Sequence, residues 1–130
     1  MGPTATILIP AYNEGTVIAR TLRDLTQDMA SDEFQIIVIA NACHDDTVAQ
    51  ARRACPQALV LDTPQGGKTN AMNLGFAQAV SPVVLCLDDD LSVPAGHIRD
   101  LIQPLPSGAT AALGRTNVDL AGCPRAFRSF

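Results

Sequence analysis

The sequence predicts an α/β fold in three layers, with helices covering both faces of a mainly parallel central sheet. Short apolar runs of strand length alternate with helical stripes four times along the 130 residues, which is typical of parallel βαβ crossovers. The run Val83–Leu87 shows no polar alternation, as expected of a strand buried on both faces. Hydrophobic residues make up 47% of the chain, enough for one aliphatic core in a single domain over residues 1–130.

The first half of the chain predicts two strands, each followed by a helix. Thr6–Pro10 is an apolar run closed by a proline, which we interpret as the first buried strand. The helix after it, which Asn13 can cap, ends near Ser31 and Asp32. Its apolar positions are Val17, Ile18, Leu22, Leu25 and Met29. Phe34–Ala40 predicts the second strand. The second helix is expected to be capped by His44 or Asp45 and to carry Val48, Ala51 and Ala54.

The second half predicts three more strands and two more helices. Ala58–Leu61 is a short third strand, and the loop after it contains Pro64, Gly66 and Gly67. The third helix begins at Lys68 or Thr69, with apolar positions at Met72, Leu74, Phe76 and Ala79. After the central strand, Pro94 predicts the first turn of a fourth helix that uses Ile98, Leu101 and Ile102 and ends before Pro104. Ala109–Leu113 predicts a fifth strand, and the stretch up to Phe130 is left open.

Three consecutive carboxylates, Asp88, Asp89 and Asp90, follow the central apolar run directly. Side chains alternate along a strand, so Asp88 and Asp90 are expected on one side and Asp89 on the other. Their mutual repulsion is relieved when a divalent cation lies among them. Ligands bind at the carboxyl ends of strands in open α/β sheets, which favours a metal site over the alternative of a solvated acidic turn.

Three further loops suggest a nucleoside diphosphate as ligand. Tyr12 and Asn13 offer a flat ring and exposed backbone groups for a base, although they could equally form a capped helix start. Asn41 follows the second strand and could bond a base edge or act as a turn residue. Gly67 and Lys68, the only lysine of the chain, come at a helix start, which suits an anion. The alternative is a solvated lysine.

Two nucleotide-binding motifs are excluded by sequence. Gly67, Lys68 and Thr69 match the end of GxxxxGK[ST], but Asp62 stands where the first glycine is required. A carboxylate at that position would obstruct and repel a phosphate. The dinucleotide motif GxGxxG is absent.

Composition excludes other function classes. A net charge of −4 and a pI of about 4.8 argue against a nucleic-acid surface. No apolar run approaches the ~18 residues of a membrane span, and no signal peptide is evident. His44 and His97 have no evident nucleophile partner and are interpreted as structural. The four cysteines lack zinc-site spacing, so we expect them to be reduced in a cytoplasmic protein; they are Cys43, Cys55, Cys86 and Cys123.

Four sequence blocks together resemble a known family. They are ILIPAYNEGTVIARTL, IIVIANACHDDT, GGKTNAMNLGFAQA and VVLCLDDD. In this order and spacing they resemble the nucleotide-binding half of family 2 glycosyltransferases, which have the GT-A fold. The resemblance covers residues 5 to about 105. It implies a Rossmann-like nucleotide-diphospho-sugar transferase fold over residues 1–130 whose acceptor-side portion is missing or incomplete.

The resemblance also implies roles for individual residues. By analogy the first loop packs on the base, and its residues are Pro10, Ala11, Tyr12 and Glu14. Asn41 takes the place of an acidic residue that often holds uracil in the family. Lys68, after Gly67, matches a basic position. The run of aspartates matches the DxD element, with Asp88 and Asp90 as ligands of Mn²⁺ or Mg²⁺ and Asp88 and Asp89 reaching the donor.

The implied function is that of a metal-dependent glycosyltransferase that moves a sugar from a UDP- or GDP-linked donor to an unknown acceptor. A metal at the diphosphate would stabilise the charge that develops on the leaving group. No general base is identified, because Asp119 is the only carboxylate after Asp100 and its surroundings do not resemble a base motif.

Two alternatives stay open beside the transferase. One is a nucleotide-sugar-binding module, or truncated fragment, without transfer. The other is a metal-dependent nucleotidyltransferase, which the first loop disfavours because it is neither glycine-rich nor basic. Homodimer formation, and membrane association through an acceptor or further segments, are also left open.

Overall fold

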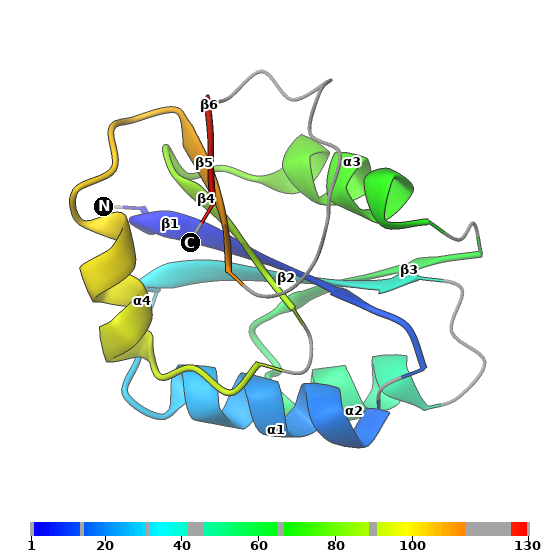
Figure 1. Cartoon of the computed structure of the whole chain (residues 1–130). Coiled ribbons are helices and arrows are strands. Elements are labelled where there is room, and N and C mark those ends of the chain that lie inside the picture. The colour runs from blue at the N-terminus through cyan, green and yellow to red at the C-terminus, as the bar shows by residue number, and fades with distance from the viewer. Residues whose placement is uncertain are drawn as a thin grey trace.

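The computed structural model describes residues 2–13, 15–30, 32–41, 46–64, 67–88, 91–113 and 126–129. Strands and helices alternate along these segments. In chain order they are β1 (Ala5–Ala11), α1 (Gly15–Thr26), β2 (Phe34–Asn41), α2 (Thr47–Ala54), β3 (Leu59–Thr63), α3 (Lys68–Gln78), β4 (Val84–Leu87), α4 (Ala95–Ile102), β5 (Ala109–Leu113) and β6 (Ala126–Ser129). Figure 1 shows α1 and α2 on one side of the central sheet and α3 on the other.

The strands form one six-stranded sheet in the order β3-β2-β1-β4-β5-β6, and every neighbouring pair is parallel. This confirms the predicted three-layer α/β fold. The chain starts at the middle of the sheet, builds outward to β3, and then returns through α3 to β4 on the other side of β1. The loops after β1 and β4 therefore diverge, and a crevice at such a switch point is where open α/β sheets bind ligands.

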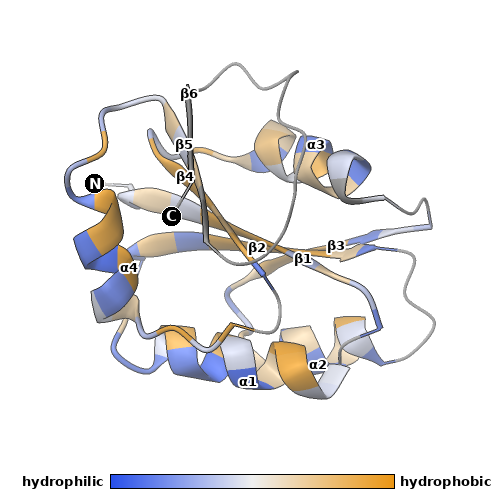
Figure 2. Ribbon diagram, in the orientation of Figure 1, coloured by the Kyte–Doolittle hydropathy of each residue, from blue (hydrophilic) through white to orange (hydrophobic). Residues whose placement is uncertain are grey.

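Both faces of the sheet are buried by helices. On one face Ile7 and Leu85 of the sheet pack in a cluster with Leu22 of α1 and Ile98 of α4. On the other face Leu8 packs in a second cluster with Met72 of α3 and its neighbours. β1 is buried along its whole length because it lies between the two clusters. Figure 2 shows the central strands as predominantly apolar and the helices as mixed.

Most element boundaries agree with the sequence prediction, and those of β5 match it fully. β3 begins one residue later than expected and extends to Thr63. α1 ends at Thr26, before the predicted Ser31–Asp32, where the Thr26 hydroxyl donates to the carbonyl of Leu22 (2.8 Å). The undecided C-terminal stretch contains β6, which pairs with β5.

Two further predictions about the helices were wrong. Asp46, rather than His44 or Asp45, occupies the N-cap position of α2. Residues 42–45 themselves lie outside the described part. Leu74 was expected in the core but is 37% exposed. α3 instead contacts the sheet through Met72 and Gly75, where a Cβ would lie 2.9 Å from a methyl group of Leu8.

Candidate functional site

Those residues predicted to bind a ligand that the structure describes lie at the carboxyl edge of the sheet. Ala11 is paired with Ala40, so Asn41 follows immediately beside the end of β1. Leu8 is paired with Cys86, and extending this parallel register by two residues brings Asp88 level with Pro10. The ends of β1, β2 and β4 thus lie side by side, with β1 and β4 at the switch point.

The loop after β1 offers one exposed ring. Tyr12 is 57% exposed, which leaves a face of the phenol available for stacking. Asn13 has a φ of 48°, in the left-handed region that asparagine tolerates, and this turn leads the chain into α1. Pro10 and Ala11 are buried within β1, so their backbone rather than their side chains would face a ligand. Glu14 lies outside the described residues.

Asn41 is the most unusual polar group of this edge. The residue is only 6% exposed, and its Oδ1 has no hydrogen-bond partner in the described structure. Buried polar atoms in native proteins nearly always have a partner, because an unpaired one costs free energy. An N–H group of a bound ligand would satisfy this acceptor.

The start of α3 is suited to an anion. Gly67 holds the N-cap position with a φ of 103°, a conformation that favours glycine, and as a glycine it has no side chain of its own to cap the helix. The first turn contains no acidic residue, so nothing of the helix itself offsets the positive end of its dipole. Lys68 is the first residue of α3, although its side chain is outside the described part.

Asp88 directly follows β4 and is half-buried. The N–H of Leu91 donates to the carbonyl of Asp88 (3.2 Å). The hydroxyl of Ser92 then bonds the carboxylate of Asp24 on α1. The second contact ties Ser92, four residues after Asp88, to α1.

The metal site stays a prediction. Asp89 and Asp90 lie outside the described residues, and within the described part no three His, Cys, Asp or Glu side chains gather in a way that could hold a metal. The donor chemistry fits a hard cation, since carboxylate oxygens are the ligands that Mg²⁺ and Mn²⁺ prefer.

Two cavities lie at the opposite, amino-terminal edge of the sheet. One, of about 500 Å³, is lined by Thr4, Glu33, Val83 and Arg99 among others. The second, of about 410 Å³, includes Met29, Phe34 and Gln57 in its lining. Neither coincides with the predicted ligand residues, and the charged groups of the first are already paired with each other.

Sequence reasoning missed two contacts at the ligand edge. One is the bond between Ser92 and Asp24, which lie 68 residues apart and give no local signal. The other joins Gly15, at the start of α1, to Asp46, at the start of α2. The only sequence signal for it is a glycine at the first helical position, where a side chain would ordinarily be tolerated.

The comparisons with known proteins point to one family. A family model described as glycosyl transferase family 2 matches residues 6–126. An uncharacterized glycosyltransferase of Mycobacterium tuberculosis is 29% identical over 114 residues, which cover 88% of this chain and 49% of the relative.

Solved structures share the fold. A mannosyltransferase from Pyrobaculum calidifontis, solved with GDP-Man and Mn²⁺, is similar with a TM-score of 0.67 and 26% identity, covering 88% of this chain and 36% of that protein. Glucosyl-3-phosphoglycerate synthase from Mycobacterium tuberculosis, solved with Mn²⁺, UDP and glucosyl-3-phosphoglycerate, gives a TM-score of 0.68 at 22% identity, covering 80% of this chain and 40% of that one. The chain spans less than half the length of these proteins. Among its described helices, none has the length and hydropathy needed to cross a membrane.

Proposed function

The chain belongs to glycosyl transferase family 2, and we propose that residues 1–130 form one nucleotide-sugar-binding domain that contributes its site to metal-dependent sugar transfer. The single observation that best supports a ligand at this edge is the buried, unpaired Oδ1 of Asn41, next to the β1 end that leads into the exposed Tyr12. A buried polar atom that has no hydrogen-bond partner in the protein is explained if a bound ligand supplies that partner.

The base would lie between the loops after β1 and β2. An asparagine amide can accept from one N–H and donate to a neighbouring carbonyl. Uracil and guanine both present such an N–H beside a carbonyl, which supports a UDP- or GDP-linked donor. Tyr12 would stack on the base, and the backbone of Pro10 and Ala11 would border it. Glu14 is proposed to complete this pocket on the strength of the family resemblance.

The diphosphate would lie between the start of α3 and the end of β4. The positive end of the α3 dipole, with Gly67 and Lys68, attracts the anion. Asp88 and Asp90 would hold Mn²⁺ or Mg²⁺, and Asp89 would reach the donor. The ion supplies positive charge for the leaving diphosphate, which an otherwise acidic chain of net charge −4 needs.

The acceptor side is not assigned. No general base is proposed from these residues, and the acceptor stays unknown. The placement of the protein in the reducing cytoplasm is likewise a proposal, supported by the buried, free thiol of Cys55.

Calorimetric titration of UDP and of GDP, each with and without Mn²⁺, tests the donor site. We expect one nucleotide to bind in the presence of Mn²⁺ and to lose most of its affinity when the metal is chelated. Absence of binding to either nucleotide with Mn²⁺ would contradict the proposal. A panel of UDP- and GDP-sugars then separates a transferase from a binding module, since a module that only binds releases no free nucleotide.

A further inference from the structure

We propose that Asp46 is a positioning residue of this nucleotide site: its carboxylate holds the start of α1 and so fixes the Tyr12 loop against the end of β2. This inference rests on the proposed function, because it concerns the same base pocket. It assigns a role to a residue that contacts neither base nor metal in the proposal.

The contact between Asp46 and α1 is possible because residue 15 is a glycine and has no side chain. Gly15 is the first residue of α1 and is buried. A Cβ added to it would lie 2.5 Å from Oδ1 of Asp46, closer than real Cβ atoms approach other atoms. The carboxylate therefore occupies the space that any side chain at position 15 would take. Only glycine allows α1 to begin against it.

The two carboxylate oxygens of Asp46 lie against different helices. Asp46 occupies the N-cap position of α2, yet its side chain makes no capping hydrogen bond there. Oδ2 accepts from Nε2 of Gln50 (2.9 Å), which leaves Oδ1 directed at Gly15. The first turn of α1 carries no acidic residue, so Asp46 supplies the negative charge that stabilises this helix N-terminus from a neighbouring element.

The contact lies where it can set the width of the base pocket. Gly15 comes three residues after Tyr12, and Asp46 comes five residues after Asn41. Joining positions 15 and 46 therefore ties together the two loops that we propose to hold the base. Binding groups on loops need such supporting contacts to keep their geometry.

The start of α3 and Asp88 do not depend on this contact, so base binding and diphosphate binding can be measured apart. We expect Asp46→Ala to weaken UMP binding about tenfold, the scale of effect that supporting residues show elsewhere. Binding of inorganic pyrophosphate with Mn²⁺ should be unchanged. If GDP is the preferred nucleotide, GMP replaces UMP. Equal losses for both probes would reveal a general structural role and overturn the inference.

Two further variants control this experiment. Gln50→Ala removes the hydrogen bond to Oδ2 but keeps the carboxylate, and it should bind UMP within about twofold of the unmodified chain. Asp46→Asn keeps the size of the side chain and should recover part of the affinity lost in Asp46→Ala. An Asp46→Ala variant that binds UMP as well as the unmodified chain would overturn the proposal.

A double substitution tests the contact itself. Gly15→Ala should lower the thermal midpoint and UMP affinity in the unmodified chain, because the new methyl group displaces the carboxylate. In the Asp46→Ala background the methyl group has room, so the second substitution should cost little. Additive losses would show that the two residues do not interact. The thermal part of this cycle needs no ligand, so it still tests the contact if the unmodified chain binds no nucleotide and the proposed function fails.

Discussion

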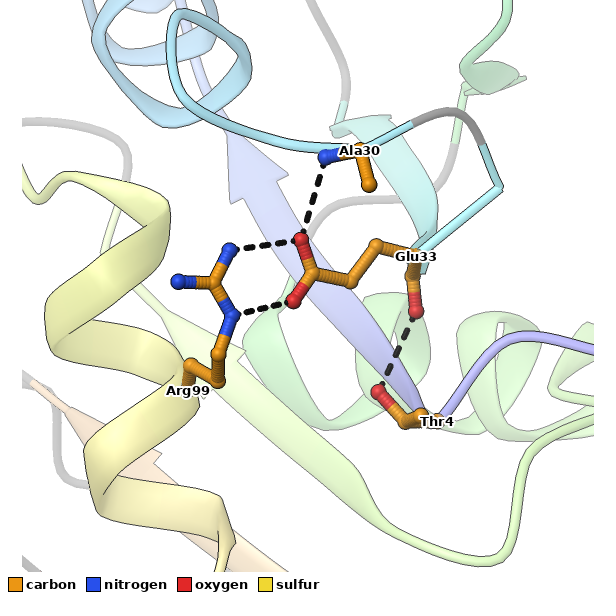
Figure 3. Close-up of polar contacts among 4 residues, drawn as sticks. All are labelled: Thr4, Ala30, Glu33 and Arg99. Atoms are coloured by element: carbon orange, nitrogen blue, oxygen red, sulfur yellow. Dashed lines mark hydrogen bonds and ion pairs between the residues drawn. The ribbon is translucent and has the colours of Figure 1, made fainter.

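At the amino-terminal edge of the sheet Glu33, Arg99 and Gln35 are hydrogen-bonded within the fold, whereas at the carboxyl edge the buried Oδ1 of Asn41 is left without a partner in the described structure. Figure 3 shows the paired edge. The carboxylate of Glu33 accepts from Nη2 of Arg99 (2.8 Å) and from the backbone N–H of Ala30 (3.1 Å), and the Thr4 hydroxyl donates to the Glu33 carbonyl (3.2 Å). At the other edge, Oδ1 of Asn41 has no partner in the described structure.

Two amides on β2 make the contrast sharpest, because they lie at opposite ends of one strand. Oε1 of Gln35 accepts from the Thr6 hydroxyl (2.6 Å) and the N–H of Val80 (2.9 Å), and its Nε2 donates to the carbonyl of Gln78 (3.0 Å). Gln35 thus joins β1, β2 and the end of α3. An amide with all its partners stabilises the fold, whereas the unpaired Oδ1 of Asn41 costs stability that a ligand at the proposed site would restore. The amino-terminal edge therefore maintains the structure, and the carboxyl edge is the one that we propose to bind a ligand.

The largest expected effect on stability comes from Gln35→Ala. Three hydrogen bonds are lost, and their partners become partly unpaired, which should cost roughly 2–3 kcal/mol of unfolding free energy. Urea unfolding measures this cost. Nucleotide affinity at a temperature where the variant is folded should not change. Gln57→Ala is the matched control, since this exposed glutamine has no side-chain hydrogen bond in the described residues and should be neutral.

Asn41→Ala should have the opposite effect to Gln35→Ala, because it should lower nucleotide affinity rather than stability. Loss of the hydrogen bonds to the base should weaken nucleotide binding by about 10- to 100-fold, since each such bond between partners of a buried site contributes ~1–3 kcal/mol. The free energy of unfolding without ligand should stay level or rise, because an unpaired buried carbonyl has been removed. Calorimetry and urea unfolding on the same preparation check both. A large loss of stability with unchanged affinity would reverse the assignment of the two edges.

The sequence predicted the strands well because burial on both faces leaves a plain apolar run. It also placed Asn41 and Asp88 at one edge, since the carboxyl ends of parallel strands must meet. It could not show that α3 contacts the sheet through Gly75 rather than Leu74. The buried face of a helix is predicted from the spacing of apolar side chains, and a glycine has no side chain to contribute. The contact of Asp46 with α1 was missed for the same reason, because the residue that it packs against, Gly15, also has no side chain.

Contacts between residues far apart in the sequence could not be predicted from local sequence patterns either. Glu33 and Arg99 lie 66 residues apart, and their pairing depends on how α4 packs beside the loop after α1. The strand order likewise depends on which way each crossover turns. The local sequence pattern predicts where a strand ends. Which polar groups form hydrogen bonds there depends on how the helices and strands pack.

Glu33→Gln tests the paired edge by its pH dependence. The hydrogen bond from Arg99 lowers the pKa of Glu33 below its ordinary value of 4.5. A carboxylate with a lowered pKa stabilises the fold fully above that ordinary value, and this stability is lost as the pH falls through the folded pKa. The thermal midpoint of the unmodified chain should therefore exceed that of Glu33→Gln by a few degrees at pH 7.

The difference in thermal midpoint between the unmodified chain and Glu33→Gln should shrink as the pH is lowered below 4.5. It should also shrink in 1 M NaCl, because Arg99 is half exposed and its charge is screened by salt. Nucleotide affinity at pH 7 should be the same in both. A midpoint difference that persists to low pH would mean that the Glu33 charge contributes nothing.

The smallest expected effect concerns a paired contact beside the proposed metal site. The bond from Ser92 to Asp24 holds the segment after Asp88 to α1. Ser92→Ala should weaken Mn²⁺-dependent nucleotide binding about threefold, because an exposed hydrogen bond contributes only ~0.5–1 kcal/mol. Nucleotide binding without metal should not change. Asp24→Asn should produce a similar loss, whereas Asp28→Asn, a charge change just past the end of α1, should not. If Asp28→Asn weakened metal-dependent binding as much as Asp24→Asn, the effect would come from net charge, and the carboxyl edge would need no paired support.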